Sequence, residues 1–282
     1  MSHIYVNRNT LPEAWEEAVI RCWEEGDQVK TQYDKPGDPP SRDCTAMIVI
    51  QDPMAEPRIH KAFPGSLEDL EKYRLEVVDG VRNHWIDPES GKWSYTYNQR
   101  LRKYPYYDDQ GKKCFQDQIE QVIEQLVKDD FTRRAQAMTW IPNVDGNSND
   151  PPCLQSLWLR VVNGKLRMNI RIRSNDAYKA SNMNIWAFIH IQKQIAEELS
   201  RRTNRTIPLG PYTHYSDSFH IYGSYFDEFE RFLKSIKDRP FEERVWRSDH
   251  PIVLECFESA RKQIEKERGM TPQEVNKLWL KS

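Results

Sequence analysis

Residues 150–176 constrain the fold more than any other stretch, because apolar and charged side chains alternate on both sides of an Asn-Gly pair. The segments CLQSLWLRVV and KLRMNIRIR each show the period of two that is typical of strands. Asn163 and Gly164 between them are a strong signal for a two-residue hairpin turn. The sequence therefore predicts an antiparallel pair of strands whose outer ends, at Cys153 and Arg173, lie together.

Helical and strand patterns interleave along the rest of the chain. We expect helices over 11–26, 66–80, 114–130 and 184–203. Gly26 is the expected C-cap of the first helix, and the second helix should begin at its N-cap Ser66 and end at Gly80. Further strands are expected over 45–52, 135–142 and, as a short element, 218–223, with a mobile loop over 33–43 and a mostly helical end. We find no internal repeat and no clean linker, so we predict one α/β (α+β) domain over 1–282.

Composition narrows the class of protein. The chain of 282 residues is 38% hydrophobic and 30% charged, and it lacks the apolar run of about 20 residues that a spanning helix needs. We therefore expect a soluble, cytoplasmic protein. A net charge of −2 does not favour nucleic-acid binding through a basic surface. The five cysteines are scattered and odd in number, which predicts reduced thiols and neither a disulfide framework nor a metal site.

Several motifs in a fixed order resemble the thymidylate synthase family, including its pyrimidine hydroxymethylase branch. DPPC is followed twenty residues later by RSND, then by Asn184 and SDSFHIY, while YTYNQRLR and DQIEQVIEQLVKDDFTRR match further segments. RSNDAYKASNMN and FHIYGSYFDEF are most similar to archaeal and phage members or to the hydroxymethylases. The resemblance implies a thymidylate synthase-like fold, with a large mixed sheet covered by helices and a homodimer formed through the sheet. It divides the domain into a variable N-terminal part with a phosphate loop (1–92), a catalytic core (93–223) and a helical C-terminal part (224–282).

The resemblance also implies a covalent mechanism. Cys153 is the expected nucleophile, adding to C6 of a pyrimidine so that C5 can attack a one-carbon unit from 5,10-methylenetetrahydrofolate. A thiol needs a nearby positive charge to populate its thiolate, and we expect Arg173 to supply it. Tyr97 is expected to help remove the proton from C5, and Asp176 to lie near the pterin and its water network.

Five further expectations concern the phosphate of the nucleotide. The resemblance implies that Arg173, Ser174, Arg133 and Arg134 bind this dianion, which rewards several planar guanidinium groups at once. In the family the twin arginines come from the second subunit. Arg42, in the loop PSRDCTA, is a candidate for a further ligand that closes over the nucleotide.

Sugar and base are assigned to three other residues. His220 and Tyr222 alternate onto one face of the short strand, where the family uses them to hold the sugar hydroxyl. Asn184 takes the base-reading position. A carboxamide can donate to uracil O4 and accept from N3–H, whereas cytosine offers the opposite pattern and suits a protonated carboxylic acid. Asn184 therefore favours uracil.

The sequence also departs from the family. The catalytic glutamate of the family stands seven residues before a glycine that resembles Gly80, but Tyr73 occupies that position here. Glu76, one turn further on the same helical face, is our candidate, and Glu71 is the alternative. Leu154 replaces the histidine that usually follows the cysteine, and the chain ends VNKLWLKS where other members have a small apolar tail. These departures predict a difference in how folate is handled.

Three functions remain open at this point. The favoured one is a thymidylate synthase that converts dUMP to dTMP. The second is a hydroxymethylase acting on dUMP, dCMP or CMP, in which water captures the methylene intermediate. The third is an inactive homologue that binds nucleotides or RNA, although we expect no stable nucleic-acid complex and no membrane partner. The sequence does not decide between ribose and deoxyribose.

Overall fold

The main sheet organises the computed structural model, which describes residues 1–87, 93–271 and 273–275. Its central path contains β1 (His3–Arg8), β3 (Ser41–Ile50), β11 (Leu209–Ile221), β9 (Lys165–Ile172), β8 (Leu154–Val162) and β7 (Gln136–Met138), in that spatial order. β2 (Asp27–Val29) pairs with β3, and β10 (Asn175–Asp176) pairs with β11. Parallel pairs such as β1–β3 and β9–β11 stand beside antiparallel pairs such as β8–β9. The sheet is therefore mixed, as predicted.

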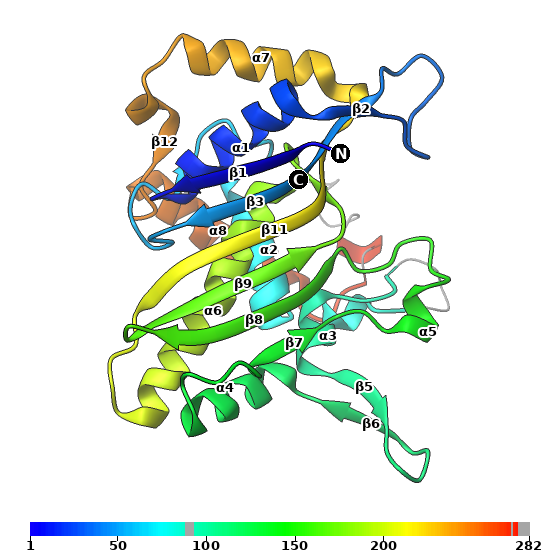
Figure 1. The fold of residues 1–282 in the computed structure, drawn as a ribbon, viewed down its shortest axis with the longest axis vertical. Helices are drawn as coiled ribbons and strands as arrows, with labels where there is room; N and C mark the ends of the chain where they lie inside the picture. The colour runs from blue at the N-terminus through cyan, green and yellow to red at the C-terminus, as the bar shows by residue number, and fades with distance from the viewer. Residues whose placement is uncertain (88–92, 272, 276–282) are drawn as a thin grey trace.

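Helices α2 and α6 lie behind the central strands in Figure 1. The α-helices are α1 (Leu11–Glu25), α2 (Leu67–Arg74), α3 (Tyr97–Arg102), α4 (Gln118–Lys128), α5 (Pro142–Asp145), α6 (Ser181–Thr203), α7 (Phe226–Lys237) and α8 (Pro251–Glu267). α2 continues into a π-helical turn, η1 (Leu75–Asp79), and 3-10 turns occupy Asn83–Trp85, Gly223–Tyr225 and Phe241–Arg244. Two small sheets pair β4 (Ile59–His60) with β12 (Val245–Trp246), and β5 (Tyr104–Tyr107) with β6 (Lys113–Gln116). Among the described residues, no helix has the length and apolarity to span a bilayer.

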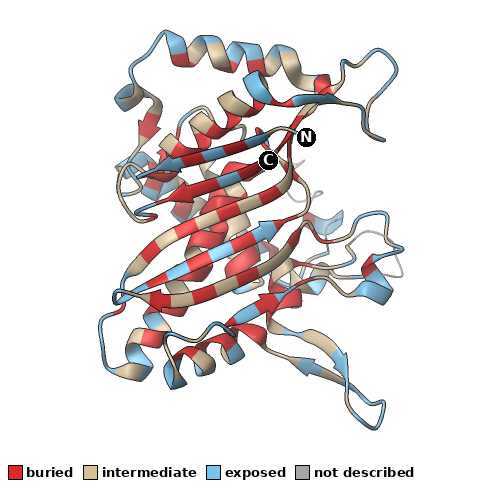
Figure 2. Ribbon diagram, viewed as in Figure 1, coloured by how far each residue is buried: buried red, intermediate tan, exposed pale blue. Residues whose placement is uncertain are grey.

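One face of the sheet is buried and the other is open. Along β9 buried and exposed residues alternate strictly, and Figure 2 shows the alternation as bands of colour. Cross-strand partners share a face. One row of partners on the open side is Tyr5, Met47, Tyr215, Arg171, Ser156 and Met138. We call this side of the sheet the open face. Tyr5, Met47 and Met138 are 53%, 42% and 42% exposed, so apolar side chains stand in solvent there.

The local signals in the sequence are confirmed. Ser66 caps α2, and its hydroxyl accepts a hydrogen bond from the Asp69 amide at 3.0 Å. Gly26 follows α1 as its C-cap. Asn163 and Gly164 both have positive φ, 53° and 73°, as a two-residue hairpin turn of this kind requires.

Three predicted elements have wrong boundaries. The segment 33–43 is not loop throughout, because β3 begins at Ser41. The helix predicted over 114–130 begins only at Gln118, since Lys113–Gln116 forms a strand paired with β5. The short strand predicted over 218–223 is the last part of β11, which runs for 13 residues. Its first part contains Gly, Pro and Ser, which hide a strand pattern, but pairing on both sides with β3 and β9 stabilises it.

Candidate active site

Cys153 and Arg173 meet at the outer end of the β8–β9 hairpin, as predicted. The Arg173 amide donates to the Cys153 carbonyl at 2.9 Å. The guanidinium donates to the carbonyls of Pro151 and Pro152, at 2.6 and 3.1 Å, and its Nη2 lies 3.8 Å from Cys153 Sγ. The two prolines before the cysteine therefore present main-chain oxygens that hold the cation beside the sulfur.

Burial and charge act in opposite directions on the Cys153 thiol. Burial raises the pKa of Cys153 above its ordinary value, Arg173 acts in the opposite direction, and Asp150 adds to the increase. Arg173 therefore acts on the thiol in the expected direction, towards the thiolate. The guanidinium lowers the thiol pKa, but desolvation of the sulfur outweighs it.

A cavity of about 260 Å³ opens beside this cysteine segment, and Tyr97 links the two. The Tyr97 hydroxyl accepts a hydrogen bond from the amide of Leu154, the residue after the cysteine, at 3.3 Å. The cavity is lined by Tyr73, Glu76, Trp93, Ser94, Tyr95, Thr96, Tyr97 and Asp150. It therefore combines flat aromatic walls with two carboxylates.

Glu76 lines this cavity from the π-helical turn, and a neighbouring helix fixes that turn. Asn98 Nδ2, from α3, donates to the carbonyls of Val77 and Val78 at 3.3 and 2.8 Å. Gly80 ends the turn with φ of 68°, and a Cβ there would stand 2.4 Å from Asn98 Oδ1, so only glycine fits. Burial raises the pKa of Glu76, although its ion pair with Arg82 at 3.0 Å acts against the increase. The carboxyl group therefore holds a proton more readily than a solvated one, as a general acid requires.

Glu71, the alternative, is placed elsewhere. Its carboxylate is 1% exposed and forms ion pairs with Arg74 at 2.7 Å and Arg261 at 2.8 Å. These contacts join α2 to α8. Glu71 is not among the residues that line the cavity.

Asn184 lies in the first turn of α6, and Tyr73 contacts it. The Tyr73 hydroxyl is 2.5 Å from Asn184 Oδ1. Tyr73 also lines the cavity, whereas Asn184 is not among its lining residues, so Tyr73 stands between the base-reading candidate and the cavity.

His220 and Tyr222 lie together at the end of β11, as predicted. Their rings are 4.6 Å apart and nearly perpendicular. Ser218 Oγ donates to Asp43 Oδ2 at 2.8 Å and lies 3.1 Å from His220 Nδ1. Burial raises the pKa of Tyr222 to about 12, so its hydroxyl is protonated at neutral pH.

The Asp176 carboxylate is held by its own turn. Oδ1 accepts hydrogen bonds from the amides of Tyr178 and Lys179, at 3.1 and 2.8 Å, and Oδ2 accepts one from the Tyr225 hydroxyl. Ser174 lies two residues earlier, half-buried between β9 and β10. The parallel pairing of Asp176 with His220 brings this turn to the end of β11.

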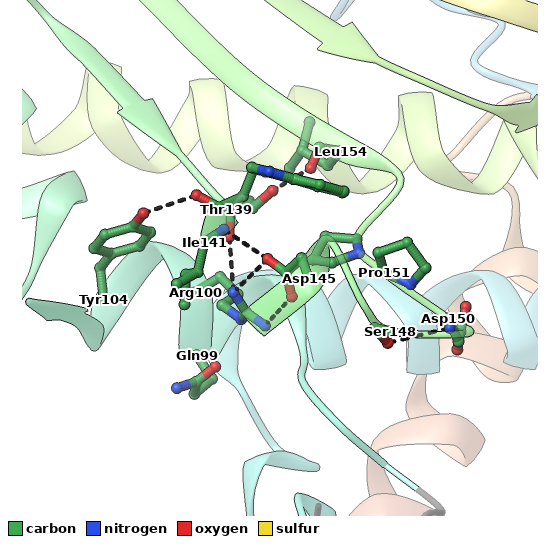
Figure 3. Close-up of polar contacts among 12 residues, drawn as sticks. Gln99, Arg100, Tyr104, Thr139, Ile141, Asp145, Ser148, Asp150, Pro151 and Leu154 are labelled. Atoms are coloured by element: carbon green, nitrogen blue, oxygen red, sulfur yellow. Dashed lines mark hydrogen bonds and ion pairs between the residues drawn. The ribbon is translucent and has the colours of Figure 1, made fainter. Parts of the chain in front are cut away.

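A buried ion pair fixes the backbone that leads into β8 (Figure 3). Arg100 donates to both oxygens of Asp145, at 2.9 and 2.7 Å, and to the Thr139 carbonyl at 3.0 Å. Asp145 also accepts the Ile141 amide at 2.6 Å, and the Thr139 hydroxyl donates to the Leu154 carbonyl. The helix that carries Tyr97 is thereby fixed to the first residue of β8.

Arg133 and Arg134 lie at the other end of β8. Both are exposed, and the Arg133 carbonyl accepts a hydrogen bond from Trp158 Nε1 at 3.0 Å. Trp158 stands five residues along the strand from Cys153, roughly 16 Å at the usual rise per residue. The protomer does not bring the twin arginines to Cys153. Because Trp158 pairs with Asn169 on the open face, they border that face instead.

The predicted placement of Arg42 is wrong. It lies within β3, paired with Gln28 and Ile221, and its guanidinium is 5.8 Å from the ring of Trp23. Its Nη1 donates to the Gly26 carbonyl at 3.5 Å. A residue in a central strand cannot belong to a mobile loop that closes over a ligand, because both neighbouring strands fix its backbone.

Comparisons with known proteins agree with this geometry. The family model described as thymidylate synthase matches residues 65–273. A protein of Methanosarcina barkeri described as "Putative thymidylate synthase" is 30% identical over 231 residues, which are 82% of this chain and 95% of that protein. A protein of Methanocaldococcus jannaschii with the same description is 28% identical over 77% of this chain and 90% of its own length. The solved structure of thermostable thymidylate synthase A from Bacillus subtilis superposes with a TM-score of 0.59 at 20% identity, covering 80% of this chain and 84% of that one.

This chain belongs to the thymidylate synthase family. It is therefore a one-carbon transferase of the methyltransferase type. The predicted thymidylate synthase-like fold in one domain is confirmed.

Sequence reasoning missed several residues of this thymidylate synthase-like site. Asn98, Tyr95 and the Arg100–Asp145 pair were not singled out, and Tyr73 was noted only as a departure from the family. The spacing of Tyr73 and Glu76 on one helical face was the available signal for Tyr73. The C-terminal segment VNKLWLKS lies mostly outside the described residues.

Proposed function

We propose that this chain is a thymidylate synthase, which transfers a one-carbon unit to C5 of a pyrimidine nucleoside monophosphate, with dUMP as the favoured substrate. One observation carries the proposal: Cys153 Sγ lies 3.8 Å from Arg173 Nη2, next to a cavity lined by Glu76 and Tyr97. A nucleophile, a cation and a proton-holding carboxyl group are the parts that covalent activation of a pyrimidine needs.

The residues divide the chemistry between them. Cys153 adds as a thiolate to C6, and Arg173 stabilises that thiolate. Negative charge then develops at O4, where Glu76 can supply a proton because its pKa is raised. The Tyr97 hydroxyl, held by the amide of the residue after Cys153, is assigned to help removal of the proton from C5.

The cavity walls suit a pterin. Trp93, Tyr95 and Tyr97 offer flat surfaces for a planar ring, and Asp150 offers a carboxylate for its ring N–H groups. 5,10-methylenetetrahydrofolate, when bound, supplies the one-carbon unit. Asp176 is assigned to the water network near the pterin.

Separate residues are assigned to the base, the sugar and the phosphate of the nucleotide. Asn184 reads the base, His220 and Tyr222 hold the sugar hydroxyl, and Arg173 and Ser174 bind the phosphate. Arg42 remains a predicted phosphate ligand, although without a closing loop.

We further propose that the protein acts as a homodimer through its open face. Arg133 and Arg134 border that face, at the far end of β8 from Cys153. A second copy packed there would cover Tyr5, Met47 and Met138 and could bring the twin arginines to the phosphate of its partner. The cytoplasmic location stays a prediction from the sequence.

A product assay with labelled 5,10-methylenetetrahydrofolate and dUMP tests the proposal. We expect tritium release from C5-labelled dUMP together with formation of dTMP and dihydrofolate. The C153S variant should release no tritium and form neither product. Tetrahydrofolate and a hydroxymethyl nucleotide would instead identify a hydroxymethylase. Failure to release tritium from any pyrimidine nucleotide would identify an inactive, nucleotide-binding homologue.

A further inference from the structure

Tyr73 contacts the base-reading candidate directly. Its hydroxyl, on the last turn of α2, lies 2.5 Å from Asn184 Oδ1 on the first turn of α6. Asn184 is 7% exposed, so its carboxamide is held away from bulk solvent. The bond joins two helices whose residues are 111 positions apart in the chain.

The length of this bond fits one orientation of the carboxamide. A carboxamide can rotate by half a turn, which exchanges its oxygen and nitrogen. Bonds of the O–H···O type span about 2.5–3.0 Å, whereas N–H···O bonds span about 2.7–3.2 Å. The structure has the amide oxygen beside Tyr73, and the separation of 2.5 Å lies within the range of an O–H···O bond.

Tyr73 also keeps its role as a donor across the working pH range. Burial raises the pKa of Tyr73 well above its ordinary value, and the neighbouring Glu76 acts in the same direction. Among the described residues, the structure gives no protein acceptor to Asn184 Nδ2, and that atom is not sealed off from solvent. The amide nitrogen is thus the group left to donate to a ligand.

Orientation decides which base a carboxamide reads. When the amide nitrogen of Asn184 faces the C4 substituent of the base, it donates to uracil O4. The amide oxygen then accepts from N3–H through the lone pair that Tyr73 does not use. Rotated by half a turn, the same side chain would accept from the amino group of cytosine and donate to its N3. An asparagine that rotates freely would accept both bases.

We propose that Tyr73 is a specificity-determining positioning residue, whose hydroxyl fixes the carboxamide of Asn184 in the orientation that accepts uracil and rejects cytosine. This inference rests on the proposed function, since it concerns the nucleotide of the same site. It assigns a role to the tyrosine that occupies the family's glutamate position.

The test measures nucleotide binding without turnover. Dissociation constants for dUMP and dCMP are determined by calorimetry in the absence of folate, for the wild type and for Tyr73→Phe. We expect the preference for dUMP to fall by roughly tenfold in Y73F, the usual effect of one buried hydrogen bond. The matched control is Y212F, because the Tyr212 hydroxyl is also buried and bonded, to His214 Nδ1 at 3.0 Å, within β11. It should keep the wild-type preference.

A double variant shows whether Tyr73 acts through Asn184. N184A should remove most of the preference, and Y73F/N184A should remove no more. The inference is overturned if Y73F keeps the wild-type preference, if Y73F changes the preference equally with and without Asn184, or if the wild type has no preference. A wild type that prefers dUMP but releases no tritium from it would overturn the proposed function and leave this binding role intact.

Discussion

The two ends of β8 hold the two halves of the proposed site, and they differ in how they are fixed. At the Cys153 end, the backbone is fixed by a hydrogen bond that the Tyr97 hydroxyl accepts, by hydrogen bonds that Arg173 donates and by the buried Arg100–Asp145 pair. At the other end, Arg133 and Arg134 are exposed.

The difference indicates which part of the site a single chain can form without a second copy. Placing a nucleophile and a proton donor needs a rigid, desolvated frame, which a single protomer provides through its core. Binding a phosphate needs mainly positive charge, which exposed side chains can bring from a second copy.

The largest expected effect comes from mixing two inactive variants. C153S and the double variant R133A/R134A should each lose activity, by about a thousandfold or more for the nucleophile. Because both lesions would fall in the same site of a mixed dimer and leave its other site intact, mixing them under exchange conditions should restore about a quarter of wild-type turnover.

The control for that experiment uses two residues from the same end of β8. Mixing C153S with R173A leaves a lesion in every site and should restore nothing. If both mixtures behaved alike, the twin arginines would not act across the dimer.

The next largest effect is the loss of stability when the buried Arg100–Asp145 pair at the Cys153 end is broken. D145N removes the carboxylate from a pair in which the side chains are 4% and 2% exposed, so we expect a loss of about 3–5 kcal/mol in the free energy of unfolding. D249N, in a pair with side chains 61% and 63% exposed, should cost less than about 1 kcal/mol. Chemical denaturation measures both. Equal costs would show that the buried pair does not fix the frame.

The two glutamates of the 66–80 segment should separate activity from stability. E76Q should lower kcat by about a hundredfold with little change in Tm, because it removes a proton donor in the cavity. E71Q should lower Tm and largely spare kcat, since Glu71 joins Arg74 and Arg261. The reverse result would assign the catalytic role to Glu71.

The smallest effect concerns the acidity of the thiol. The rate of Cys153 alkylation, followed on its peptide by mass spectrometry, should rise with pH through a midpoint above that of an ordinary thiol. R173Q removes the charge that lowers the pKa, so its rate at neutral pH should fall by roughly tenfold. D150N removes a charge that raises the pKa, so its rate should increase. The half-exposed Cys256 of the same samples is the internal control, and shifts of the same sign in both variants would contradict this account.

Local signals explain why part of this structure could be predicted. The Asn163–Gly164 turn and the alternating strands are encoded within neighbouring residues, so the meeting of Cys153 and Arg173 followed from them. The helical spacing also selected Glu76 as the candidate glutamate, and Glu76 lines the cavity.

Contacts between distant segments explain what was missed. Asn98 holds the turn of Glu76 from 20 and 21 residues away, and Tyr73 reaches Asn184 across 111 residues. No periodicity in the sequence records such pairs. Arg42 was misplaced because the prolines before it hide the start of β3.

By itself, the sequence determined the hairpin that joins a cysteine to an arginine, the helix caps and the family, because short-range backbone preferences and motif spacing are written in neighbouring residues. Only the tertiary structure decided that Cys153 is a weak acid, that Glu76 and not Glu71 faces the cavity, and that Tyr73 holds Asn184. Those outcomes depend on which groups lose their water and which partners replace it, and that is settled when distant elements pack together.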